Sequence, residues 1–156
     1  MAEIHVSVDS SLPPEAVLGA ATDFSKHRLE IWPTIDPEVY GVEALDEKSA
    51  VVREGTHVLG GLWAKERYDW SEDGVVRATV MESNTFRTGG IWQMTVRPTD
   101  VGGSHVELLW NRRGSGLKGL VVLLAMRLTG KARLEAGLHE TPRLVEKARL
   151  SVRTAG

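Results

Sequence analysis

Two side chains on one predicted strand have the chemistry of a proton-transfer site. Glu66 and Tyr68 lie two residues apart within 62–70, so a strand would place both on one face. If that face is internal, Glu66 must be neutral or paired with an arginine or a tyrosine hydroxyl. A carboxyl group in an apolar cleft can act as a general acid or base. We therefore take Glu66 and Tyr68 as candidate catalytic residues, and Glu66 alternatively as a polar anchor. A register shift at Gly60–Gly61 would instead turn Glu66 to water.

Large apolar side chains recur at spacings that predict one shared internal surface. The chain has five tryptophans but only two tyrosines and two phenylalanines. Trp92 and Met94 share a face of one predicted strand, Trp110 lies on the next, and a leucine-rich stripe beginning at Leu117 is expected to face them. These side chains either fill a core or line a ligand cavity. The candidate ligand-binding residues are Glu66, Tyr68, Trp70, Trp92, Met94, Trp110, Val121, Leu124 and Leu128.

Other kinds of site find little support. No cysteine is present, which removes disulfides, thiol nucleophiles and thiolate metal ligands. The five histidines never pair at the i, i+2 or i, i+4 spacing and form no HExxH pattern. We expect no metal and no cofactor. Arg112, Arg113 and Lys118 could rim the mouth of a pocket and attract an acidic head group, or form a solvated cluster.

Charge and hydropathy limit the classes of partner. The net charge is -2 and the pI is about 6.2, so nothing in the overall charge favours nucleic acid. The longest apolar run, Leu120–Met126, is far shorter than the roughly 20 residues of a membrane span, so we expect no stable membrane insertion. Because this run is apolar on all sides, it is either buried or meets a partner subunit or a lipid bilayer, and it favours a homodimer.

The first six residues lack the basic and apolar regions of a signal peptide. We therefore expect a cytoplasmic protein.

The order of predicted elements indicates an α+β fold within one domain, 1–156. Alternating residues predict a first strand around Ile4–Val8, and Pro14 opens a helix to about Thr22 that precedes a second short helix ending near Ile31. Further strands are predicted over 39–45, 50–58, 62–70, 75–82, 90–97 and 104–112. Short turns between them, such as Asp73–Gly74, imply an antiparallel sheet of seven strands.

A long helix is predicted from Gly116 onward. Pro142 should kink it, or restart it with Thr141 as the cap. We expect the seven-stranded sheet to curve around this helix and to leave a hollow between them.

Several segments resemble those of a known superfamily. Residues 12–17, Asp23–Phe24 and Trp32–Pro33 resemble the opening of START/Bet v 1-like (SRPBCC) proteins. The stretch Trp63–Trp70 resembles the strand that carries a tryptophan–glutamate–tryptophan pattern in polyketide cyclase/dehydrase-like members. The resemblance implies a helix-grip fold whose cavity holds lipids, polyketides or hormones. Iron ligands of ring-hydroxylating relatives are absent from the sequence.

Three functions follow as hypotheses. The first is binding or carriage of a lipophilic small molecule, such as a lipid or a polyketide-like compound, in the central cavity. The second is a polyketide cyclase/aromatase or dehydratase in which Glu66 moves protons and Tyr68 donates a hydrogen bond to an enolate. The third is a partner-binding module without a ligand that uses Leu120–Met126.

Overall fold

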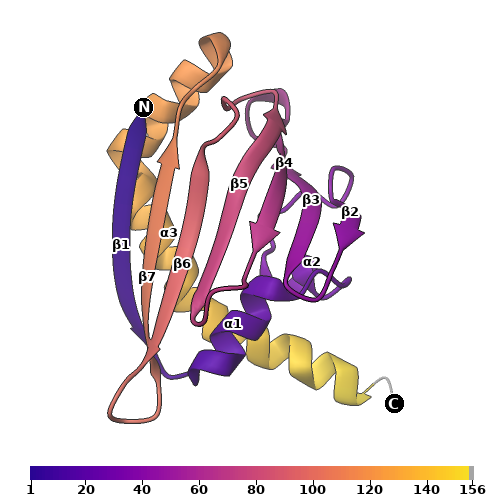
Figure 1. Cartoon of the computed structure of the whole chain (residues 1–156), viewed down its shortest axis with the longest axis vertical. Coiled ribbons are helices and arrows are strands. Elements are labelled where there is room, and N and C mark those ends of the chain that lie inside the picture. Colours follow the sequence, from indigo (N-terminus) through magenta and orange to yellow (C-terminus); the bar gives the residue numbers. More distant parts are fainter. Residues whose placement is uncertain (155–156) are drawn as a thin grey trace.

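The sheet and one long helix dominate the computed structural model, which describes the backbone of residues 1–154 and the side chains through Leu150 together with that of Arg153. The strands are β1 (Ala2–Ser10), β2 (Gly41–Leu45), β3 (Ser49–Thr56), β4 (Leu62–Asp69), β5 (Val75–Ser83), β6 (Ile91–Pro98) and β7 (Ser104–Arg112). The helices are α1 (Pro14–Thr22), α2 (Arg28–Ile31) and α3 (Gly116–Thr154), with a 3-10 turn η1 (Val58–Gly60). Figure 1 shows α3 behind the sheet, from the β1 side to below α1.

All strand pairs are antiparallel, in the order β1-β7-β6-β5-β4-β3-β2. Each strand from β2 to β6 is followed by a short connection to the next strand in sequence. β1 pairs with β7 and forms the other edge of the sheet. The β4–β5 turn depends on Gly74, which has a φ of 71° and where a Cβ would lie 2.8 Å from the carbonyl oxygen of Val96. The arrangement confirms the predicted seven-stranded sheet and long C-terminal helix of a helix-grip fold.

Alternation along β4 directs its functional side chains inward. Ala64, Glu66 and Tyr68 are buried, whereas Arg67 is exposed. A bulge interrupts the pairing of β4 with β5 between Lys65 and Glu66, but the register with β3 runs unbroken across this point. The inward placement predicted for Glu66 is therefore confirmed.

The core fills the space between the sheet, α1 and the inner face of α3. Valines of β1, β3, β5 and β7 meet Leu123 and Leu138 of α3 there. Glycines let the helix approach closely: a Cβ on Gly130 would lie 2.6 Å from the Cδ1 atom of Ile4, and one on Gly119 would collide with the carbonyl oxygen of Thr85. The face with these glycines is the one that packs on the sheet.

The leucine-rich stripe of α3 has the opposite orientation from the prediction. Val121, Leu124 and Leu128 are 44%, 59% and 77% exposed, and Leu117 and Leu120 are exposed as well. The expectation that this stripe faces the sheet is wrong. The physical reason is that residues 120–126 are apolar all round, so periodicity alone could not select a face. Close approach through Gly119 and Gly130 selects it instead.

Pro142 does not divide the last helix. α3 continues through it, so the expected restart with Thr141 as cap is wrong. The hydroxyl of Thr141 donates to the carbonyl oxygen of Gly137 at 2.9 Å, one turn earlier in the same helix. Among the residues that the structure describes, no helix has the length and apolar character needed to cross a bilayer.

Candidate functional site

A cavity of about 380 Å³ lies between the sheet and the middle of α3, and we call it the grip cavity. Its walls come from β3, β4, β6, β7, α2 and α3. Its apolar lining includes Trp32, Trp92, Leu108, Met126, Leu134 and Leu138, and its polar lining includes Arg28, Glu54, Glu66, Tyr68, Arg112 and Arg133. Apolar walls around a few converging polar groups are typical of a small-molecule site.

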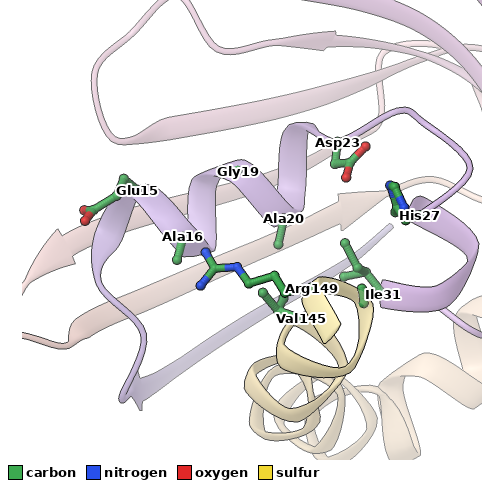
Figure 2. Close-up of a pocket in the computed structure, with 10 residues that line it drawn as sticks. Glu15, Ala16, Gly19, Ala20, Asp23, His27, Ile31, Val145 and Arg149 are labelled. Atoms are coloured by element: carbon green, nitrogen blue, oxygen red, sulfur yellow. The ribbon is translucent and has the colours of Figure 1, made fainter. Parts of the chain in front are cut away.

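A smaller groove of about 190 Å³ separates α1 from the end of α3. Figure 2 shows Glu15 and Asp23 near opposite ends of α1, with Arg149 reaching from α3 beneath it. None of these three charged side chains is buried, so water screens them from one another. The groove gathers no buried polar group, and we place the candidate site in the grip cavity.

Arg28 occupies one side of the grip cavity with its hydrogen-bonding capacity well used. Its Nε donates to the carboxylate of Glu54, its Nη2 donates to the Tyr68 hydroxyl at 3.1 Å, and its Nη1 donates to the carbonyl oxygen of Ala21 at 3.1 Å. The guanidinium also lies over the ring of Phe24, with Cζ 4.4 Å from the centroid. Burial lowers the pKa of Arg28, but Tyr68 and Glu54 raise it above its ordinary value overall, so Arg28 remains a cation.

Tyr68 joins this arginine to the rest of the cluster. Its hydroxyl donates to Oε2 of Glu54 at 2.9 Å while accepting from Arg28. Burial, reinforced by the charge of Glu54, raises the pKa of Tyr68 well above the ordinary value. The phenol therefore stays protonated, and its single proton is already committed to Glu54.

Glu66 and Arg112 form a second buried pair. Nη2 of Arg112 donates to Oε1 of Glu66, and both side chains are almost fully buried. Burial raises the pKa of Glu66 above its ordinary value, and the opposing attraction of Arg112 only partly offsets this. A carboxylate whose pKa is raised in this way accepts a proton more readily than that of an exposed glutamate.

Arg112 differs from Arg28 in one respect that bears on binding. Its Nε is buried and has no hydrogen-bond partner among the described residues. The guanidinium is held over the rings of Phe86 and Trp110, with Cζ 4.9 Å and 5.7 Å from their centroids. A buried donor without an acceptor is costly, so an oxygen atom placed beside it would gain a charge-assisted hydrogen bond.

The structure brings three of the predicted ligand-binding residues to the grip cavity: Glu66, Tyr68 and Trp92. Three others pack elsewhere on the inner side of the sheet. Trp70 stacks on Phe24 at a centroid distance of 5.8 Å, Trp110 meets Phe86 edge to face at 5.8 Å, and Met94 is only 1% exposed within the core. Val121, Leu124 and Leu128 lie on the outer face of α3, outside the grip cavity.

The sequence analysis did not identify Arg28 or Glu54 as site residues. For Arg112 it left two roles open, at the rim of a pocket or in a solvated cluster. The alternation of Ala50, Val52 and Glu54 along β3 could have placed Glu54 on the inner face. Arg28 carries no such signal, because a four-residue helix has no periodicity to read. The two adjacent arginines at the end of β7 differ in burial, since Arg112 is buried and Arg113 is exposed.

Comparisons with known proteins agree with this architecture. A family model described as polyketide cyclase/dehydrase and lipid transport matches residues 1–146. No curated protein matches the chain. Similar solved structures include a protein from Thermus thermophilus, with a TM-score of 0.69, 15% identity, and coverage of 97% of this chain and 99% of that one.

Two further structures have the same TM-score of 0.69. The Zhui aromatase/cyclase from a Streptomyces species is 16% identical, with 99% of this chain and 98% of that chain covered. A START superfamily protein from Mycobacterium smegmatis is 12% identical, with coverage of 92% and 97%. At these identities the likeness shows a shared fold and leaves the ligand to be argued from the cavity.

Proposed function

The chain belongs to the polyketide cyclase/dehydrase and lipid transport family, and on this basis we propose that its grip cavity binds a lipophilic small molecule bearing an oxygen acceptor. The observation that carries the proposal is the combination of apolar walls with the buried, unpartnered Nε of Arg112. The walls favour an apolar body, and the Arg112 guanidinium, which lines the cavity and has a donor without a partner among the described residues, favours a carbonyl, hydroxyl or carboxyl oxygen on it.

The binding free energies explain why both the apolar walls and the hydrogen-bond donor are needed. Burying about 300 Å² of apolar ligand surface at about 25 cal/mol/Å² contributes roughly 7 kcal/mol. Association costs at least about 4 kcal/mol in lost freedom of motion, so the walls alone give weak binding. A hydrogen bond from a buried guanidinium contributes roughly 1.5–3 kcal/mol and also orients the ligand.

The charges that line the grip cavity limit the kinds of ligand head group that would bind there. The pairs Arg28–Glu54 and Arg112–Glu66 nearly balance one another, and the exposed Arg133 adds one positive charge to the lining. A ligand with a multiply charged head would meet both carboxylates at short range, which is unfavourable in a poorly hydrated cavity. A neutral carbonyl or hydroxyl oxygen, or a single carboxylate near Arg133, fits these charges better.

A variant that fills the cavity from α3 tests the proposal. Gly137 lines the grip cavity, and a Cβ there would meet nothing within 4 Å. Gly137→Phe should therefore obstruct the cavity without a backbone clash. Ala136→Phe, at the exposed neighbouring position, is the matched control because it adds the same ring outside the cavity.

The readout is the rise in melting temperature caused by a library of fatty acids, sterols and aromatic polyketide-like compounds. We expect at least one compound to stabilise the wild type and Ala136→Phe but not Gly137→Phe. A library that stabilises none of the three proteins, or all three equally, would contradict binding in this cavity.

A second candidate function is proton transfer on a poly-β-ketone by Glu66. Its support is the raised pKa of this buried carboxyl and the fold shared with an aromatase/cyclase. Against it, the Tyr68 proton is engaged by Glu54 and cannot also be donated to an enolate unless that bond breaks. Turnover of a poly-β-ketone by the wild type, lost in Glu66→Gln, is the expected result for an enzyme; unchanged turnover in that variant would remove Glu66 from the mechanism.

A further inference from the structure

The outer face of α3 carries an exposed apolar stripe made of Leu117, Leu120, Val121, Leu124 and Leu128. The spacing places them along one side of the first four helical turns. A contiguous row of leucines in water is unfavourable and commonly marks an interaction surface. None of the five lines the grip cavity or the groove beside α1.

The residues around the apolar stripe are mainly basic. Between residues 113 and 134 the chain has five basic residues and no acidic residue, although its overall net charge is -2. These residues are Arg113, Lys118, Arg127, Lys131 and Arg133, of which Arg133 lines the grip cavity and Lys131 lies 4.0 Å from Glu135. Lys118 and Arg127 are nine residues apart, which places them on opposite sides of the helix and so on the two flanks of the stripe.

Neighbouring segments widen the apolar surface on both flanks. Nζ of Lys118 donates to the carbonyl oxygen of Gly61 at 3.0 Å, which brings the turn containing exposed Val58 and Leu59 beside the helix. On the other flank, Nη2 of Arg127 donates to the carbonyl oxygen of Met1 at 2.7 Å, and the Met1 side chain is exposed. Figure 1 shows the first turns of α3 at the N-terminal end of β1.

We propose that the apolar stripe lies flat on an anionic lipid bilayer. A helix with an apolar face and basic flanks settles at the boundary between head groups and acyl chains, where the leucines reach about 5–10 Å deep. The basic side chains meet the anionic head groups, and each contributes roughly fivefold to the partition coefficient near such a surface. The binding is peripheral and reversible, because no described helix can cross a bilayer.

The same charges disfavour a second copy of this chain as the occupant. A twofold interface would set the flanking basic residues Lys118, Arg127 and Lys131 of one stripe against the same three of the other, with no acidic residue between 113 and 134 and only Glu135 near Lys131 to balance them. The stripe is also a convex helix face and not a groove, which suits a flat bilayer. This inference does not depend on what the grip cavity holds.

Vesicle cosedimentation tests the proposal directly. The wild type should bind vesicles of mixed phosphatidylcholine and phosphatidylglycerol and should bind pure phosphatidylcholine at least tenfold more weakly. Raising the ionic strength from about 0.1 M to about 1 M shortens the Debye length from about 10 Å to about 3 Å and should release most of the protein.

Two variants and one matched control separate the apolar and basic contributions. Leu120→Ser/Leu124→Ser should lower the partition coefficient about tenfold or more, because two leucines no longer enter the bilayer. Lys131→Glu should lower it by at least about fivefold on anionic vesicles. Leu45→Ser, an exposed leucine on β2, should leave binding unchanged. Circular dichroism checks that each variant is folded.

Several results would overturn the proposal. They are equal binding to neutral and anionic vesicles, no binding to either, or full binding by the leucine double variant. Light scattering that shows a wild-type dimer converted to a monomer by Leu120→Ser/Leu124→Ser would assign the stripe to a second copy instead. Gly137→Phe should keep vesicle binding, so a failure of cavity binding remains separate from a failure of membrane binding.

Discussion

Glu66 and Arg112 form a buried ion pair in the lining of the grip cavity. Their side chains are 46 residues apart in sequence and meet inside the molecule. Removing one partner of such a pair leaves the other charge buried and uncompensated, which typically costs about 3–5 kcal/mol. Each member of the pair therefore depends on the other, and both line the grip cavity.

The raised pKa of Glu66 predicts the sign of a pH effect. Because the folded-state pKa is above the ordinary value of 4.5, the contribution of this group to stability is complete below that pH and is lost as the pH rises through the folded-state pKa. Glu66→Gln cannot titrate. The free energy of unfolding of the wild type, minus that of the variant, should fall as the pH rises above about 4.5. Urea unfolding across this range measures it; a difference that grows with pH would contradict the assignment.

Removal of the Tyr68 hydroxyl should lower the stability of the folded protein through lost hydrogen bonds. Tyr68→Phe removes a hydroxyl that accepts from Arg28 and donates to Glu54, so two buried polar groups lose a partner. Each such group costs about 1–3 kcal/mol, and urea unfolding should show at least that much destabilisation. Tyr40→Phe is the matched control, because the Tyr40 hydroxyl donates only to the carbonyl oxygen of Phe24 and is half-buried. Equal losses in the two variants would argue against the cluster.

At the scale of elements, the β4–β5 turn determines how β4, the strand that carries Glu66 and Tyr68, pairs with β5. Gly74→Ala should destabilise by about 1–2 kcal/mol, because the left-handed backbone disfavours a side chain and its Cβ would approach the Val96 carbonyl oxygen at 2.8 Å. Gly41→Ala, where a Cβ meets nothing within 4 Å, is the control and should be near neutral. Thermal unfolding of both variants makes the comparison. A Gly74→Ala protein as stable as Gly41→Ala would show that the turn tolerates a side chain.

The long helix α3 has two faces with different roles. Its inner face approaches the sheet through Gly119 and Gly130 and lines the cavity farther along with Leu134 and Leu138. Its outer face near the start carries exposed leucines. One helix therefore contributes a wall of the grip cavity on one face and the exposed apolar stripe on the other.

For the whole molecule, ligand binding should appear as global stabilisation. A ligand that binds only the folded protein at 100 times its Kd raises the free energy of unfolding by about 2.7 kcal/mol. We expect this rise in the wild type and its absence in Gly137→Phe, measured by urea unfolding with and without a compound found in the thermal screen. The same rise in both proteins would place the ligand outside the grip cavity.

Much of the fold could be predicted because strand signals are local. The alternation in 62–70 and the turns that bound it place β4 at Leu62–Asp69, and the same alternation put Glu66 and Tyr68 on one face, which the structure shows to be the inner one. Half of the site could not be predicted in this way. The partners of these two residues, Arg28 and Arg112, lie 40 and 46 residues from them, and no local pattern links such positions.

The amino-acid sequence alone determined where strands and helices form and which β4 side chains share a face, because a period of two depends only on neighbouring residues. Only the tertiary structure decided which face of α3 is buried and which arginine meets which carboxylate. Residues 120–126 are apolar on every side, so the choice was made by close contact between Gly130 and Ile4, from opposite ends of the chain. That contact left the leucines exposed.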